Sequence, residues 1–207
     1  MGIAERKERE KEDVRRKILD AAHDLFETRG YENVTMRAVA DAIEYSPTTI
    51  YHHFASKDDL VQALCFADFE KLSQAMGDRP LPENPIDRIR TLGHAYATFG
   101  VANPNHYRFM FMTSGDWKKH QNEDDTPPAR SYAFLRDAVV QAMDQGYFEK
   151  GDVDLVAQIL WSGIHGVVSL IITFKPEQFP RVPPRPGLIE AAMEVTLRGL
   201  LVPRKEQ

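Results

Sequence analysis

The 207-residue sequence has almost no cysteine and no long stretch of apolar residues without interruption. The single cysteine, Cys65, excludes an intramolecular disulfide bond and gives no sign of secretion. The longest apolar run, residues 159–174, is broken by several small or polar residues and is shorter than the roughly 20 residues that a membrane span needs. The amino terminus has no apolar signal-peptide core. We therefore expect a cytoplasmic protein in which Cys65 is a buried thiol.

The sequence also lacks an excess of basic residues. The formal net charge is −5, and residues 1–57 carry 10 Lys+Arg against 11 Asp+Glu. This excludes a domain that attracts nucleic acid by its overall charge. The position of each charge matters more than the sum, because only cations that face phosphate release counterions. Cations that could share one side of the domain are Arg15, Arg16, Lys17, Arg37 and Lys57.

Motifs of catalytic and metal sites are missing as well. None of the 7 histidines lies four residues from another, and there is no HExxH motif or Cys-His cluster. There is no nucleophile elbow and no glycine-rich phosphate loop. We expect a protein that is not an enzyme, with no catalytic residue, no metal and no cofactor.

Apolar residues recur with helical spacing throughout, and no strand pattern is present, so the sequence predicts an all-α fold of about nine helices. Residues 1–13 are dense in mixed charge and read as a frayed extension of the first helix; a basic arm that reaches a neighbouring groove is the alternative. The predicted loops, rich in proline or acidic residues, are 77–85, 115–128 and 175–186.

Residues 35–60, TMRAVADAIEYSPTTIYHHFASKDDL, predict a helix, a turn, a short second helix and the start of a third. Thr35 is a candidate N-cap, and Ser46 followed by Pro47 is a second one. Ser56 opens a predicted capping box for the next helix. A helix too short to be stable alone, packed on one side and polar on the other, suits a recognition helix.

The helical wheel of residues 47–53 separates two faces. Ile50, together with Phe54 one turn on, must face inward, whereas the opposite face carries three polar or aromatic residues with two more on the flanks. The outward residues are Thr48, Tyr51 and His52, and the flanking residues are Thr49 and His53.

These residues resemble the TetR/AcrR family of transcriptional regulators, above all LFETRGYENVTMRAVADAI and SPTTIYHHFASKDDL. The match departs at Glu44, where the family commonly has glycine, and a side chain there disfavours a left-handed turn residue. The resemblance implies double-stranded operator DNA as a partner. It places Thr48, Tyr51 and His52 near base edges. The residues that it places near phosphates are Thr35, Arg37, Thr49, His53 and Lys57.

The carboxyl half is similar to the WHG-type ligand-binding domain of one branch of this family. The matching residues are WSGIHG at 161–166, with Asn103-Pro104 and His106-Tyr107-Arg108 upstream. This resemblance implies a helical effector domain that forms a homodimer through its last two helices. We expect a DNA-binding domain at residues 1–57 and an effector-binding and dimerisation domain at residues 58–207.

Aromatic and methionine residues are more numerous than a small helical body needs, which favours a pocket for an apolar or aromatic effector. His165 follows Trp161 by one turn, and it either faces the ligand or is bonded to a backbone or tyrosine oxygen; the two are compatible. The candidate ligand-binding residues are Phe69, Tyr96, Phe99, Tyr107, Met110, Tyr132, Trp161 and His165.

Two functions fit these features. The first is a repressor that binds a palindromic operator as a homodimer and is released by a small effector. The second is a helical small-molecule-binding protein or enzyme that contains a helix-turn-helix-like trihelix. The polar outward residues of the 47–53 helix favour the first, because a purely structural trihelix does not need them.

Overall fold

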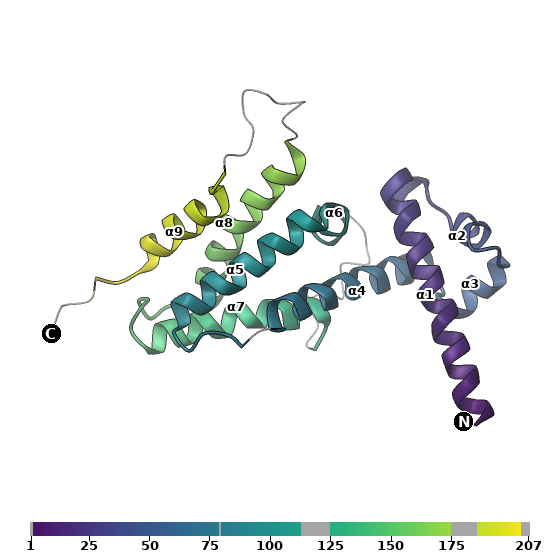
Figure 1. Ribbon diagram of the computed structural model, residues 1–207, viewed down its shortest axis with the longest axis horizontal. Helices are drawn as coiled ribbons and strands as arrows, with labels where there is room; N and C mark the ends of the chain where they lie inside the picture. Colours follow the sequence, from purple (N-terminus) through teal and green to yellow (C-terminus); the bar gives the residue numbers. More distant parts are fainter. Residues whose placement is uncertain (1, 79, 113–124, 175–185, 204–207) are drawn as a thin grey trace. The chain divides into compact units, whose positions relative to one another are not determined.

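The computed structural model describes residues 2–78, 80–112, 125–174 and 186–203 (Figure 1). Within these ranges every regular element is helical, as predicted, and one isolated bridge joins Phe148 to Leu201. Most of the predicted loops at 115–128 and 175–186 lies outside the described residues. The elements in order are α1 Ile3–Arg29, η1 Tyr31–Asn33, α2 Met36–Ala42, α3 Pro47–His53, α4 Lys57–Gly77, α5 Pro85–Ala102, α6 Pro104–Met112, α7 Pro127–Asp144, α8 Val153–Thr173 and α9 Leu188–Leu200.

The chain forms two compact units. The first comprises Met1–Asp68 and Arg108–Gln121, and the second comprises Phe69–Tyr107 and Asn122–Gln207. Helices α4 and α6 each run from one unit into the other, so the predicted domain boundary after residue 57 falls within the first unit.

The first unit is a small helical domain in which α1 packs on α2 and η1, and α2 packs on α3. Its core takes Ile18 and Phe26 from α1, Val39 from α2 and Ile50 from α3, all buried. These are the residues that the helical spacing assigns to the inward faces. The charged residues before Val14 continue α1 rather than ending it, since the helix already begins at Ile3.

Side-chain caps begin the short helices, as the sequence predicts. The Thr35 hydroxyl accepts the backbone N–H of Ala38 at 3.1 Å, and the Ser46 hydroxyl accepts that of Thr49 at 3.2 Å. Ser56 caps α4 by accepting the N–H of Asp59 at 3.1 Å. Each cap satisfies one of the amide groups that a helix start leaves without a partner.

The turn between α2 and α3 is built on a left-handed residue that is not glycine. Glu44 has φ of 59°. Its N–H donates to Asp41 O at 3.3 Å, and the N–H of Tyr45 donates to Ala40 O at 3.0 Å, which is the pattern of a Schellman motif. The hydrogen bonds of this turn therefore hold Glu44 in a conformation that its side chain disfavours.

We expect Glu44→Gly to stabilise the protein. The left-handed conformation costs a residue with a Cβ about 1–2 kcal/mol, and glycine at this position removes that cost. The greater freedom of glycine in the unfolded chain offsets roughly 0.4–1 kcal/mol of this gain in stability. A net gain of about 1 kcal/mol would raise the melting temperature by roughly 2–4 °C, measured by circular dichroism. Glu44→Ala removes the carboxylate but keeps the Cβ, and an equal gain from it would assign the effect to charge instead.

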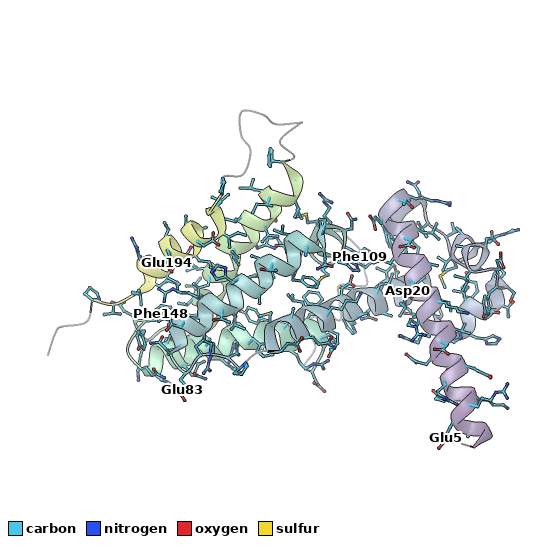
Figure 2. All side chains as sticks on the ribbon, viewed as in Figure 1. Glu5, Asp20, Glu83, Phe109, Phe148 and Glu194 are labelled. Atoms are coloured by element: carbon cyan, nitrogen blue, oxygen red, sulfur yellow. The ribbon has the colours of Figure 1, made fainter. Side chains whose placement is uncertain are left out.

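In the second unit, α5 packs against α7, α8 and α9, and α8 also packs against α7 and α9 (Figure 1). The apolar residues that recur at helical spacing along α5 are buried, with Leu92 and Tyr96 at the centre of the helix. On the surface, the Arg90 guanidinium pairs at 2.7 Å with the carboxylate of Glu194, which Figure 2 labels on α9. The hydrogen bond from Arg90 lowers the pKa of Glu194. Apolar packing and this ion pair both fix α9 on α5.

Helix α8 is apolar on most sides but has a clear inward face. Four apolar residues of α8 and α9 are buried within one subunit: Leu160, Ile164, Val168 and Leu197. Spacing alone does not predict which side of such a helix faces inward, because apolar residues lie on nearly every side. By length and composition, α8 is one helix of the described residues that could cross a membrane, but core helices share this composition.

Apolar side chains remain exposed along the other face of α8 and on α9. The exposed fractions are 56 % for Leu155, 42 % for Ile159, 48 % for Leu170 and 72 % for Val195. On α8, the exposed Ser162 and Gly166 lie between Ile159 and Leu170. All of these residues follow one another at steps of three or four, so they share one side of the helix. We call this set the α8–α9 stripe.

Candidate nucleic-acid interface and ligand site

Helix α3 presents the two faces that the sequence predicts. Ile50 is fully buried and Phe54, which ends the helix, is 4 % exposed. Thr48, Tyr51 and His52 are exposed, with Tyr51 at 54 %. The buried face of α3 is thus held by packing, and the exposed face offers a hydroxyl, a phenol and an imidazole as hydrogen-bonding groups.

The residues predicted to contact phosphates differ in whether another contact within the domain already holds them. Thr49 is half-buried, and its hydroxyl shares a 2.9 Å hydrogen bond with that of Ser46. Thr35 is exposed while its oxygen caps α2. Arg37 is exposed on the first turn of α2 and makes no ion pair within the described residues. Of these three, Arg37 offers a charge without a structural task.

Lys57 has a structural role that the sequence analysis missed. Its ammonium donates to the backbone oxygen of Tyr31 and lies 4.0 Å from the centroid of the Tyr31 ring and 5.9 Å from that of Phe26. The Tyr31 hydroxyl in turn donates to the carboxylate of Asp58 at 2.8 Å. Lys57 therefore connects the start of α4 to η1 by a hydrogen bond and a cation–π contact, and to α1 by a second cation–π contact with Phe26.

His53 lies at the edge of α3 that faces α1. Its Nδ1 is buried and has no hydrogen-bond partner among the described residues. Burial lowers the pKa of His53, and the nearby charges of Lys11, Arg15 and His52 lower it further, against an opposing effect of Glu12. The imidazole is therefore neutral near pH 7, and a phosphate contact from it would use Nε2–H. Arg15 holds its guanidinium 5.1 Å from the centroid of the Phe54 ring.

Four of the predicted ligand residues meet in one hydrogen-bonded cluster inside the second unit. Trp161 Nε1 donates to the Tyr96 hydroxyl at 3.1 Å, and the hydroxyls of Tyr96 and Tyr107 lie 2.9 Å apart. His165 Nδ1 is 2.6 Å from the Tyr107 hydroxyl and 3.0 Å from that of Tyr96. His165 is thus bonded to tyrosine oxygens, one of the two roles left open by the sequence.

Burial sets the protonation of this cluster. It raises the pKa of Tyr107 to about 12, raises that of Tyr96 well above its usual range and lowers that of His165. Both phenols are therefore neutral donors and His165 is a neutral acceptor at Nδ1. A consistent chain runs from Trp161 N–H to Tyr96, from Tyr96 to Tyr107, and from Tyr107 to Nδ1, which leaves the ring proton of His165 on Nε2.

The close approach of Tyr107 to α5 depends on Gly100. A Cβ at Gly100 would lie 2.7 Å from Cδ2 of Tyr107 and 2.6 Å from Cγ1 of Val168, closer than any Cβ contact allows. Both neighbours are fully buried, so neither can move away at low cost. A glycine within a strongly periodic helix is a sequence signal of close packing, but it does not identify the residue that packs there.

The other predicted ligand residues are not part of the cluster. Phe69 and Phe99 are buried in the second unit. The Tyr132 hydroxyl donates to the backbone oxygen of Asp154 at 3.4 Å, near the start of α8. Met110 is buried and belongs to the first unit. The cluster itself therefore comprises Tyr96, Tyr107, Trp161 and His165.

Family models match both halves of the chain. Residues 18–64 match the family described as bacterial regulatory proteins, tetR family, and residues 89–195 match the tetracyclin repressor-like C-terminal domain. The first match covers α2 and α3 completely, and the second covers most of α5 and α9 and all of α6, α7 and α8.

Individual relatives agree with the family models. The HTH-type transcriptional regulator UidR of Escherichia coli (strain K12) is 39% identical over 62 residues, which are 30% of this chain and 32% of UidR. TcmR of Streptomyces glaucescens is 35% identical over 88 residues, 42% of this chain and 38% of TcmR. These alignments span only about a third of the length of either relative.

A solved structure shows that the likeness in fold extends along most of the chain. The fatty acid degradation regulator FadR from Bacillus halodurans superposes with a TM-score of 0.72 at 16% identity, covering 88% of this chain and 94% of that one. The capped helix-turn-helix, the all-helical second unit and the matches to both family models lead to one conclusion: the chain belongs to the TetR family of bacterial regulatory proteins.

Proposed function

We propose that the protein is a DNA-binding transcriptional repressor that binds a palindromic operator as a homodimer in the cytoplasm. The observation that carries this proposal is the exposed face of α3. Thr48, Tyr51 and His52 stand free on a helix whose other face is buried and whose start is capped by Ser46. A rigid helix of this kind fits the major groove, where side chains can read base edges.

In this proposal the exposed residues of α3 read bases and the surrounding residues hold phosphates. The phosphate contacts come from Thr35 and Arg37 at the start of α2, from Thr49 and His53 on the flanks of α3, and from Lys57. Lys57 also stabilises the domain, because its ammonium already contacts Tyr31 and Phe26. Arg37 and His53 have no such second contact in the described residues.

The homodimer forms through the α8–α9 stripe. Two copies of this hairpin related by a two-fold axis would make a four-helix interface, and each stripe would cover the other. The small residues Ser162 and Gly166 lie in the middle of the α8 face and allow two helices to approach closely. A two-fold protein axis matches a two-fold operator, which is why dimer and palindrome belong to one proposal.

Selection of bound duplexes from a random pool tests the function directly. A palindrome should be enriched, with half-site centres separated by roughly 34–36 Å, about one helical turn of DNA. If no palindrome is recovered, the repressor proposal fails. A helical protein that binds only small molecules, the other function that fits the sequence, would give that result.

The Tyr96–Tyr107–Trp161–His165 cluster is the proposed centre of effector recognition. The effector is a small apolar or aromatic molecule that lies beside these four side chains, and Phe69 and Phe99 of the same unit are proposed to line its site. A ligand that fits the state unable to bind DNA better than the other state lowers operator affinity. A coupling of ~1–3 kcal/mol would weaken operator binding ~5–150-fold.

We expect Trp161→Ala to remove the effector response and to leave operator affinity nearly unchanged. The variant loses both the indole surface and the N–H that donates to Tyr96, whereas α3 is untouched. The measurement is operator titration with and without the best hit from a thermal-shift screen of apolar compounds. Tyr132→Phe is the control, because its hydroxyl bonds outside the cluster. A hit that stabilises the protein but leaves DNA affinity unchanged would contradict a regulatory role.

A further inference from the structure

The first turns of α1 carry an ordered row of cations. Lys7, Lys11 and Arg15 follow one another at steps of four residues, so they lie on one side of the helix. Lys11 precedes the buried Ile18 by seven residues, two turns of helix, which puts the row on the side that packs into the domain. The row lies on the same side of α1 as the core residues, but nearer the amino terminus than the first of them, Ile18.

Two other cations of this segment form ion pairs within α1. Arg6 pairs with Glu10 and Arg16 pairs with Asp13, both at 2.8 Å. No ion pair joins Lys7, Lys11 or Arg15 to a carboxylate within the described part of the chain. The carboxylates of Glu8 and Glu12 border the row, since each follows a row residue and lies about 100° further round the helix. The charges of Arg6 and Arg16 are thus neutralised locally, whereas those of Lys7, Lys11 and Arg15 remain available.

The row lies next to helix α3. Arg15 holds its guanidinium over the ring of Phe54, and the charges of Lys11 and Arg15 act on His53. From Arg15 the helix continues towards the amino terminus past α3, as Figure 1 shows, and Figure 2 labels Glu5 near its start. A duplex bound by α3 would therefore have its next phosphates within reach of Lys11 and then of Lys7.

We propose that Lys7 and Lys11 bind the sugar-phosphate backbone of the duplex just outside each half-site read by α3. This proposal rests on the proposed operator binding and extends it to flanking DNA of any sequence. The eight residues from Arg15 to Lys7 span about 12 Å of helix, which corresponds to roughly three base pairs. Phosphate contacts of this kind add affinity and orientation but no base preference.

The test compares two double variants that lose the same charge. The row variant, Lys7→Gln with Lys11→Gln, removes two of the three cations of the row, and Arg6→Gln with Arg16→Gln removes two cations that are paired with carboxylates. Glutamine has nearly the helix propensity of lysine and arginine, so α1 should persist in both, as circular dichroism would verify. Operator affinity is measured as a function of salt concentration on the selected duplex, with and without about three flanking base pairs at each end.

The row variant should bind the long duplex about 10- to 100-fold more weakly at physiological salt and lower the salt slope of the dimer by up to roughly 3.6. The paired-cation variant should change little. Trimming the flanks should weaken the wild type and not the row variant. The inference would be overturned if the wild type and the row variant had equal salt slopes, or if both variants lost operator affinity equally. Either result would leave the repressor proposal intact. Failure of the wild type to bind any selected duplex would instead overturn the repressor proposal.

Discussion

Replacing Leu155 and Ile159 together by glutamate should convert the dimer into a folded monomer that binds its operator at least 100-fold more weakly. Both side chains are largely exposed in one subunit, so the charges are tolerated there. In a two-fold interface they would be buried without partners, at a cost of several kcal/mol per ion. A monomer also loses the second half-site, which contributes about 10²–10⁴ to the affinity of linked sites.

Light scattering after size exclusion would measure the mass, and circular dichroism would confirm that the subunit remains folded. Val101→Glu is a matched control, because Val101 is 40 % exposed on α5 and lies outside the α8–α9 stripe. A monomeric Val101→Glu variant, or a double variant that remains dimeric, would exclude this interface. Charged substitutions at Val168 or Leu197 are unsuitable tests, since these residues are 0% and 1% exposed and a charge there would unfold the subunit.

The sequence predicts those parts of the fold that depend on local chemistry. The caps at Thr35 and Ser46 and the buried side of α3 follow from residue type and helical spacing, and the structure confirms all of them. Such features need only a few neighbouring residues, so a pattern of ten or fewer residues is enough to identify them. The bounds predicted for the short helix, residues 47–53, agree with those of α3 for the same reason.

Features that join distant parts of the chain were not predictable in this way. Nothing near Lys57 indicates that its ammonium contacts Tyr31, which is 26 residues away. The aromatic cluster was foreseen as a set of candidate residues, but spacing could not separate Tyr96 and His165, which are bonded, from Tyr132, which is not part of it. The left-handed Glu44 shows a further limit, because hydrogen bonds of the turn override the preference of one residue.

The contact between Lys57 and Tyr31 also changes the choice of a phosphate variant. Lys57→Ala would lose a hydrogen bond and two cation–π contacts, so weaker DNA binding could reflect a less stable domain. Arg37→Ala is the cleaner substitution, since Arg37 is exposed and has no ion pair in the described residues. It should weaken all duplexes to a similar extent and lower the salt slope by about one per contact, or roughly two for the dimer.

Tyr51→Ala should differ from Arg37→Ala in its dependence on sequence. The affinity for the selected operator should fall strongly, and the affinity for unrelated DNA should fall only slightly. One good base contact contributes about 1–3 kcal/mol, and each dimer has two copies, so we expect operator affinity to fall by about 30-fold or more. The salt slope should stay nearly constant because no charge is removed. Tyr51 is 54 % exposed, and its removal should leave the melting temperature close to that of the wild type.

His52→Ala and Tyr51→Phe complete this series on the same helix. His52 is exposed beside Tyr51, and its removal should change which base is preferred at one position of each half-site when the selection is repeated. Tyr51→Phe keeps the ring and removes only the hydroxyl, so it separates a hydrogen bond to a base from an apolar contact with a thymine methyl group. If Tyr51→Ala and Arg37→Ala both weaken operator and unrelated DNA equally, α3 does not read bases and its exposed face serves only to position the domain.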